Sequence, residues 1–128
     1  MITIYKSVHF FAPRQIGSYA FEMAGAANLK LAAPLPSVVS FADAEMRCIT
    51  TILELIASRP YPYPDTIVYP MTPKLLVNCP PRLVFGYYDL FRKIQDKYPG
   101  VKFEVKESFT NQWCEEKADA ILHREINR

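Results

Sequence analysis

The chain has 128 residues, 50% hydrophobic and 22% charged, which fits a single domain spanning residues 1–128. The net charge of +2, with no run of Lys or Arg, gives no support for a general nucleic-acid binder. Three cysteines without a CxxC pair predict neither a disulfide framework nor a zinc site, and the lack of a signal-peptide pattern or a bilayer-spanning apolar run predicts a cytoplasmic protein with no membrane partner.

The first third of the chain predicts three strands joined by tight turns. One strand opens at Ile2 and continues toward Phe11, and the Tyr/Phe/Met alternation of residues 17–23 indicates a second strand. Residues 25–28, Gly-Ala-Ala-Asn, are typical of a hairpin turn, and residues 29–33 then form a third strand. We therefore expect this segment to form antiparallel pairs.

Residues 41–56, FADAEMRCITTILELI, have the pattern of an amphipathic helix. Apolar side chains recur along one face at steps of three and four residues, at Met46, Ile49, Leu53 and Ile56. A helix with such a face packs on a sheet. Glu45 lies where this apolar face begins, so its carboxylate faces either a site or solvent.

The second half of the chain alternates predicted strands and helices. The β-branched run at residues 66–69 predicts a buried strand, and residues 73–77 form a short helix. Residues 83–98 predict a second long amphipathic helix, residues 101–105 a strand with one solvated face, and residues 112–126 a C-terminal helix. The order βββαβ(α)αβα predicts an α/β fold with a mixed five-stranded sheet flanked by helices.

This order of elements resembles the ribonuclease H fold, and four stretches also resemble that family in sequence. These are residues 17–20 (Gly-Ser-Tyr-Ala), 44–46 (Ala-Glu-Met), 66–78 and 116–122 (Glu-Lys-Ala-Asp-Ala-Ile-Leu). Each motif is short, but together they cover nearly the whole chain in the order that the family has. The resemblance implies a single ribonuclease H-like domain.

The resemblance also implies a metal site, because members of the family hold Mg²⁺ ions with about four carboxylates. Glu45 on the first long helix and Asp119 on the last helix match two of these acids, with Glu115 as another register for the last one. Lys6 stands where the Asp of the first strand is expected, and Met71 where the Asp after the fourth strand is expected. The implied site is therefore a relic, with two of its four acids replaced.

Two carboxylates with an ammonium group between them make a poor magnesium site, because an opposite charge within a few ångström satisfies them without a metal. We predict that Lys6 pairs with Glu45, Asp119 or both, and we expect no metal and no cofactor. The alternative is a rebuilt Mg²⁺ site at Glu45 and Asp119 that recruits further carboxylates, namely Glu22, Asp43 or Glu115.

Tyrosines and prolines are concentrated between residues 61 and 98. Tyrosine is enriched at protein interfaces, and proline lowers the entropy cost of ordering a loop on binding. Packing of loops against the sheet is the competing explanation. The candidate binding residues in this region are Tyr61, Tyr63, Tyr87, Tyr88, Arg92 and Lys93.

Three functional hypotheses follow. The first is a catalytically degenerate ribonuclease H-like domain that acts as a binding or interaction module, with a protein or a nucleic acid as partner, as an accessory part of a nucleic-acid-processing assembly. The second is an active metal-dependent nuclease with a rearranged carboxylate site. The third is an unrelated α/β protein with a structural or oligomer-forming role, including a homo-oligomer. The replaced acids argue against the usual chemistry of the family.

Overall fold

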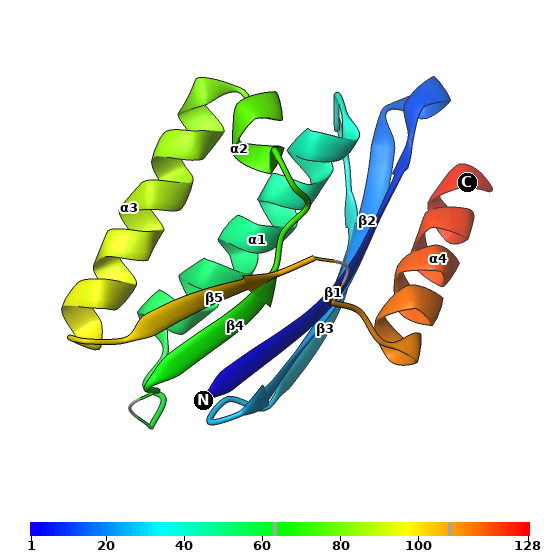
Figure 1. Cartoon of the computed structure of the whole chain (residues 1–128). Coiled ribbons are helices and arrows are strands. Elements are labelled where there is room, and N and C mark those ends of the chain that lie inside the picture. Colours follow the sequence, from blue (N-terminus) through cyan, green and yellow to red (C-terminus); the bar gives the residue numbers. More distant parts are fainter. Residues whose placement is uncertain (63, 108) are drawn as a thin grey trace.

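A computed structural model describes residues 1–62, 64–107 and 109–128 and has a five-stranded sheet with helices packed on it (Figure 1). Its strands are β1 (Ile2–Phe11), β2 (Ile16–Gly25), β3 (Leu29–Leu35), β4 (Thr66–Pro70) and β5 (Lys102–Lys106). Its helices are η1 (Ala12–Arg14, a 3₁₀ turn), α1 (Phe41–Ser58), α2 (Leu75–Asn78), α3 (Pro81–Lys97) and α4 (Gln112–Ile126). The predicted fold class and element order are confirmed.

The sheet is mixed, with the strand order β3-β2-β1-β4-β5. β1 and β2 pair antiparallel from Ile2 opposite Gly25 to Phe11 opposite Ile16, and β2 pairs antiparallel with β3. β4 joins β1 in parallel, and β5 joins β4 in parallel. β1 is therefore the central strand, and a residue on it lies close to β2 on one side and β4 on the other.

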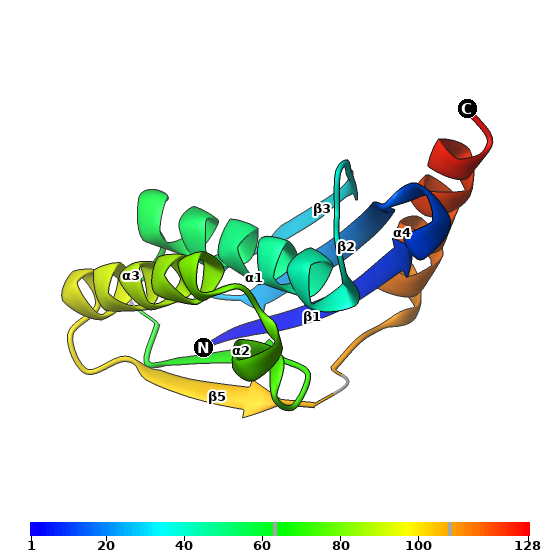
Figure 2. The same ribbon diagram turned by 90° about the horizontal axis from the view of Figure 1, so that it is seen from above.

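The helices form layers on the two faces of the sheet (Figure 2). α1 packs on β1 and β2 and also against α3, whereas α4 packs on β1, β2 and β3 from the opposite face. The large core lies between the sheet and the layer of α1 and α3, around Phe21, Met46 and Ile67. Beneath α4 the buried residues are small, chiefly Ala20 and Ala118. Small side chains let α4 lie close to the sheet.

The predicted apolar face of α1 is buried. Its four predicted positions are each at most 2% exposed: Met46, Ile49, Leu53 and Ile56. The helix begins after Ser40, whose hydroxyl accepts a hydrogen bond from the Asp43 backbone N–H at 3.0 Å. At its other end, the Lys97 ammonium group on α3 donates to the carbonyl oxygens of Ile56 and Ala57, both at 3.2 Å, and to that of Arg59. A cation on these orphan carbonyls also complements the helix dipole.

Three element boundaries differ from the prediction for identifiable reasons. β3 continues through Pro34 because it is an edge strand, where a missing N–H costs no ladder hydrogen bond. The short helix begins at Leu75, after Lys74 in a left-handed conformation with φ of 63°, rather than at residue 73. α3 begins at Pro81 instead of residue 83, because proline is preorganised for the first position of a helix.

The predicted alternation of β5 is present, but its apolar side is only partly covered. Val101 is buried and Phe103 is half-buried, whereas Val105 is 52% exposed. β5 is the other edge strand, so the helical layer that covers β4 does not extend over all of it. Within the described ranges, no helix is long and apolar enough to cross a membrane.

Candidate functional site

A cavity of about 310 Å³ opens where β1, the end of β4, the start of α1 and the start of α4 meet. It is lined by residues of all four elements and the segment before α4: Lys6, Ser7, Val8, Phe41, Glu45, Pro70, Met71, Thr72, Pro73, Phe109, Thr110 and Glu115. We call this cavity the relic cleft. It brings together four residues that the sequence associated with the metal site, namely Lys6, Glu45, Met71 and Glu115.

Glu45 points into the relic cleft and is held by three groups. Its side chain is 1% exposed, and its Oε2 lies 3.6 Å from the Nζ of Lys6, whose side chain is 9% exposed. The backbone N–H of Thr72 donates to Oε2 at 2.7 Å, and the hydroxyl of Thr72 donates to Oε1. A buried carboxylate requires a partner charge and hydrogen bonds to offset its desolvation, and Glu45 has both.

The position of Lys6 follows from the pleat of β1. Successive side chains of a strand point to opposite faces, so Lys6 shares the α1 face with the buried Ile2 and Ile4. Its backbone N–H donates to the Phe109 carbonyl at 3.2 Å, where the segment before α4 passes the middle of β1. The predicted pairing of Lys6 with Glu45 is therefore present in the structure.

Met71 directly follows β4 and is buried in the cleft wall. Its backbone N–H donates to the Lys106 carbonyl at 3.1 Å, which continues the pairing of β4 with β5 for one more residue. Its thioether is a weak, soft ligand and carries no charge, so it cannot replace a carboxylate toward Mg²⁺. Thr72, the next residue, supplies the two hydrogen bonds to Glu45. Its role was not predicted, because it depends on where the chain turns after β4.

The last helix presents Glu115, rather than Asp119, to the relic cleft. Asp119 lies one turn further along α4, is 55% exposed and has the Nδ1 of His123 3.6 Å from its Oδ2. It lines a separate hollow of about 360 Å³ with Glu115, Glu116, Ser7 and His9. Residues four apart share a helix face, so periodicity alone could not choose between the two registers. The contact of the segment before α4 with Lys6 selects Glu115.

The other two acids proposed for a rebuilt site lie elsewhere. Glu22 on β2 accepts a hydrogen bond from the side-chain amide of Asn111 at 2.9 Å. Asp43 is buried and accepts hydrogen bonds from Arg47 Nε at 3.1 Å and from the Val39 N–H at 3.1 Å. Both carboxylates thus accept hydrogen bonds from other groups of the chain, and neither lines the relic cleft.

The donor set of the relic cleft does not fit the Mg²⁺ site implied by the fold. Lys6 places a positive charge beside Glu45, and both oxygens of Glu45 already accept hydrogen bonds from Thr72. The remaining carboxylate is Glu115, and Mg²⁺ sites need several oxygen ligands in octahedral geometry. Among the residues that the structure describes, no group of three or more His, Cys, Asp or Glu side chains could hold a metal ion.

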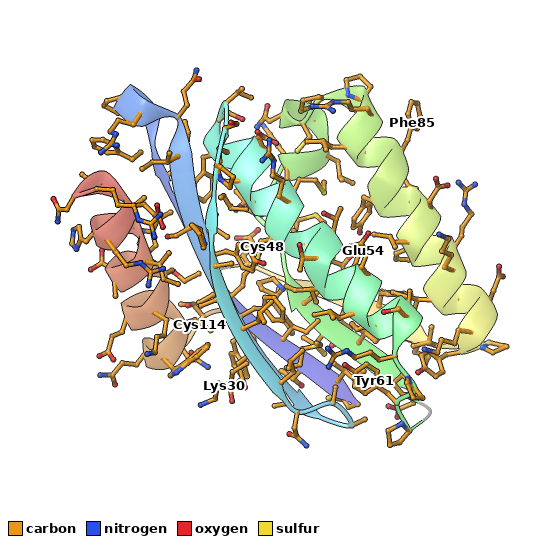
Figure 3. All side chains as sticks on the ribbon, turned by 180° about the vertical axis from the view of Figure 1, so that it is seen from behind. Lys30, Cys48, Glu54, Tyr61, Phe85 and Cys114 are labelled. Carbon is orange, nitrogen blue, oxygen red and sulfur yellow. The ribbon has the colours of Figure 1, made fainter. Side chains whose placement is uncertain are left out.

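A buried thiol lies beneath the cleft. Cys48 on α1 is 0% exposed and faces the sheet (Figure 3). Burial raises the pKa of Cys48 to about 12, an effect that Lys6 partly opposes and Glu45 reinforces. Burial also raises the pKa of Cys114 on α4, to about 11. Thiols of this kind are neutral and unreactive at physiological pH, so they are core residues and not nucleophiles.

The predicted tyrosine-rich binding face is only partly exposed. Tyr87 was predicted as a binding residue but is a core residue, 4% exposed, whose hydroxyl bonds that of Tyr69 at 2.5 Å. Burial raises the pKa values of both phenols. Tyr61 is half-buried and packs against the large core, and its buried hydroxyl has no hydrogen-bond partner among the described residues. Tyr63 lies outside the described residues.

Tyr88, Arg92 and Lys93 are the predicted binding residues that α3 does expose. Tyr88 is 46% exposed, and Arg92 is bound to Asp89 on its own helix, with Nη2 2.6 Å from Oδ1. Lys93 lines a groove of about 490 Å³ between α1 and α3, and Glu54 of α1, labelled in Figure 3, lines the same groove. This groove is larger than the relic cleft, and its lining mixes apolar residues with polar ones: Leu55, Ala57 and Leu90 with Thr51, Glu54, Ser58 and Lys93.

Comparisons with known proteins show a fold and no closer relationship. No protein-family model matches the sequence, and no curated protein matches it. Among solved structures, the N-terminal ribonuclease H domain of a Mycobacterium tuberculosis protein is similar with a TM-score of 0.69 and 10% identity, over 98% of this chain and 96% of that chain. Ribonuclease H1 from the archaeon Halobacterium salinarum is similar with a TM-score of 0.60 and 12% identity, over 94% and 92%. The chain therefore has a ribonuclease H-like fold.

Proposed function

We propose that the chain is a catalytically degenerate ribonuclease H-like domain that acts as a binding or interaction module, as an accessory part of a nucleic-acid-processing assembly. One observation carries this proposal. The Lys6 ammonium lies 3.6 Å from Glu45 Oε2 inside the relic cleft, with Met71 in the adjoining wall. The cleft thus contains its own counter-ion at the place where the fold would otherwise gather carboxylates around metal ions.

The Lys6 charge opposes the binding of a metal ion at Glu45. A metal ion bound at Glu45 would approach the Lys6 ammonium closely, and two cations a few ångström apart in a buried site repel strongly. Removing the lysine from Glu45 to admit a metal would leave an ammonium group buried without its partner. Both effects oppose Mg²⁺ binding, and without metal ions the fold lacks the groups that activate water for phosphodiester hydrolysis.

A cleavage assay tests the proposal. An RNA–DNA hybrid and single-stranded RNA and DNA are incubated with Mg²⁺ or Mn²⁺ and the wild-type chain, Glu45→Gln or Glu54→Gln. Glu54 is the matched control, because it is an exposed carboxylate on the same helix and lies outside the relic cleft. We expect no cleavage by any of the three. Cleavage that Glu45→Gln abolishes and Glu54→Gln retains would overturn the degenerate assignment.

The alternative function is an active nuclease with a rearranged site, and Glu115 is the observation in its favour. Glu115 and Glu45 line the same cavity, so two carboxylates of different helices converge there. In the same assay, this alternative requires that Glu115→Gln abolish cleavage as Glu45→Gln does. A nuclease insensitive to both substitutions is a contaminant, because it does not use this cleft.

The cellular setting is also a proposal. Cys48, Cys79 and Cys114 are free and buried, as expected for a protein that folds in a reducing compartment such as the cytoplasm.

The exposed apolar side chains of α3 favour a protein partner over a nucleic acid. Phe85 is 68% exposed and Tyr88 is 46% exposed. Phe85 projects from the outer side of α3, away from the core (Figure 3).

A further inference from the structure

We propose that the relic cleft binds a cationic side chain, the guanidinium or ammonium group of an Arg or Lys on a partner protein, through Glu115 and the neighbouring aromatic rings. The inference rests on the proposed function, because it requires a cleft that is not occupied by metal ions. It assigns to the cleft a ligand of the charge opposite to that of a nucleic-acid phosphate.

The charges of the cleft support a cationic ligand. Lys6 and Glu45 neutralise each other, which leaves Glu115 as the unbalanced charge of the lining. The Glu115 side chain is exposed and makes no hydrogen bond or ion pair within the described part of the chain. Among the described lining residues, the ionisable ones are one lysine and two glutamates, which give the lining a net charge of −1.

Charged residues in the hollows next to the cleft add to its negative charge. On the side of α4, the adjoining hollow adds the carboxylates of Glu116 and Asp119. On the side of β5, the adjoining cavity contains Lys74 and Glu107, whose charges balance. The net charge of the cleft and of the hollow beside it is negative, so we expect the cleft to attract cations and to repel phosphates.

The walls of the cleft suit the stem and the flat face of an Arg or Lys side chain. Phe41, 45% exposed at the start of α1, and Phe109, half-buried before α4, both line the cleft. The Phe109 ring is stacked on Tyr5, with ring centroids 4.6 Å apart and planes inclined by 14°, which holds it in place. Aromatic faces attract cations, and Met71 with Val8 offers apolar surface to a hydrocarbon stem.

The volume is consistent with a side chain rather than a larger ligand. A cavity of about 310 Å³ is at the small end of ligand pockets, which are mostly apolar with a few polar groups that fix orientation. Here the candidate polar groups are the Glu115 carboxylate and the hydroxyl of Thr110. The Lys6 ammonium is committed to Glu45 and so is not a free anion receptor.

The test is a titration of the ¹⁵N-labelled chain followed by NMR, with acetyl-arginine amide as the probe. Acetyl-citrulline amide is the neutral isostere, and inorganic phosphate is the anionic probe. We expect the arginine probe to shift the amide signals of Glu115, Phe41 and Phe109, with binding about tenfold weaker for citrulline. Phosphate is expected to leave these signals unchanged.

Two substitutions sharpen the result. Glu115→Gln should weaken arginine binding about tenfold, whereas Glu104→Gln, at an exposed carboxylate of β5 that lines neither the cleft nor the adjoining hollow, should change it by less than about twofold. Both positions are exposed, so both variants are expected to fold, and their amide spectra verify this. Equal binding of arginine and citrulline, insensitivity to Glu115→Gln, or shifts of the cleft signals by phosphate would overturn the inference.

A titration with MgCl₂ on the same sample separates the two proposals. Saturable Mg²⁺-induced shifts at Glu45 and Thr72 would contradict the degenerate site itself, and with it this inference. If neither Mg²⁺ nor arginine binds, the proposal of a cationic ligand is wrong, whereas the proposed function is not contradicted.

Discussion

Lys6 and Glu45 form an ion pair inside the relic cleft, with Nζ 3.6 Å from Oε2. Both side chains are almost fully buried, and a buried ion pair contributes little net stability compared with an apolar pair of the same shape. Removing one partner is different, because the other charge is then left in the interior without compensation. The pair therefore has a characteristic thermodynamic signature.

We predict that Lys6→Met lowers the free energy of unfolding by about 3 kcal/mol, since it leaves the Glu45 carboxylate without a cation. The double variant Lys6→Met with Glu45→Gln should return to within about 1 kcal/mol of wild type, because neither charge remains. Urea denaturation measures both values, with Lys93→Met on exposed α3 as control. If the single and double variants were equally destabilised, the two side chains would not interact as the structure places them.

Cys48 gives a second prediction at this scale, through its dependence on pH. Burial raises the pKa of the thiol from its ordinary value of 9.0 to about 12, so the folded chain retains a proton that the unfolded chain releases. Its contribution to stability is complete below pH 9.0 and is lost as the pH rises toward about 12. Within that window, the free energy of unfolding should fall by about 1.4 kcal/mol per pH unit from this group.

The measurement is a series of urea denaturations between neutral pH and the alkaline limit of reversible folding, for wild type and Cys48→Ala. The alanine variant should lose stability with pH less steeply, although it is less stable at neutral pH because of the cavity it leaves. Cys114, Tyr19 and the Tyr69–Tyr87 pair have raised pKa values as well, so a shallower slope remains in the variant. Identical slopes would mean that Cys48 titrates normally.

At the scale of elements, α1 and α3 are tied together at one end by a single lysine. Lys97 donates to three carbonyl oxygens in the last turn of α1 and just beyond it, those of Ile56, Ala57 and Arg59. These carbonyls have no partner within the helix, so Lys97 provides both hydrogen bonds and a favourable charge at the negative end of the dipole.

We predict that Lys97→Met lowers the free energy of unfolding by about 1–2 kcal/mol, while Lys97→Arg retains part of the contribution. Lys93→Met, one turn earlier on the same helix, should change the free energy by less than about 0.5 kcal/mol. Chemical denaturation of the three variants decides the matter. Equal effects of the Lys97→Met and Lys93→Met substitutions would show that capping of α1 by Lys97 is unimportant.

Some features of these elements could be predicted from the sequence, and others depend on tertiary contacts. The apolar face of α1 was predictable because helical periodicity places Met46, Ile49 and Leu53 on one side. The burial of Tyr87 was predictable in the same way, because Tyr87 lies on one face of α3 with Leu83 and Ile94. Its hydrogen bond to Tyr69 was not predictable, because Tyr69 comes from β4 and only the tertiary fold places the two hydroxyls together. For Glu115 and Asp119, periodicity gives the face of α4, and only the path of the chain before the helix sets the register.

At the scale of the whole molecule, the strand order was not fixed by periodicity, but the element order restricted it. Three hairpin-connected strands followed by alternating helices and strands lead to a mixed sheet, and the structure has the order β3-β2-β1-β4-β5. This arrangement places β1 between β2 and β4, so residues from the middle of β1, the end of β4 and the starts of α1 and α4 meet in one cleft. The fold is similar to that of solved ribonuclease H structures at 10–12% sequence identity.

We propose that the Lys6 ammonium takes the place of metal ions in this fold. The dependence of the melting temperature on Mg²⁺ concentration tests this proposal most directly. Wild type and Lys6→Asp with Met71→Asp are melted in increasing MgCl₂, with NaCl at matched ionic strength as control. Wild type should shift by less than about 1 °C, whereas the double variant should gain a concentration-dependent rise, because ligand binding to the folded state stabilises it. A rise in the wild-type melting temperature that Glu45→Gln removes would contradict the account.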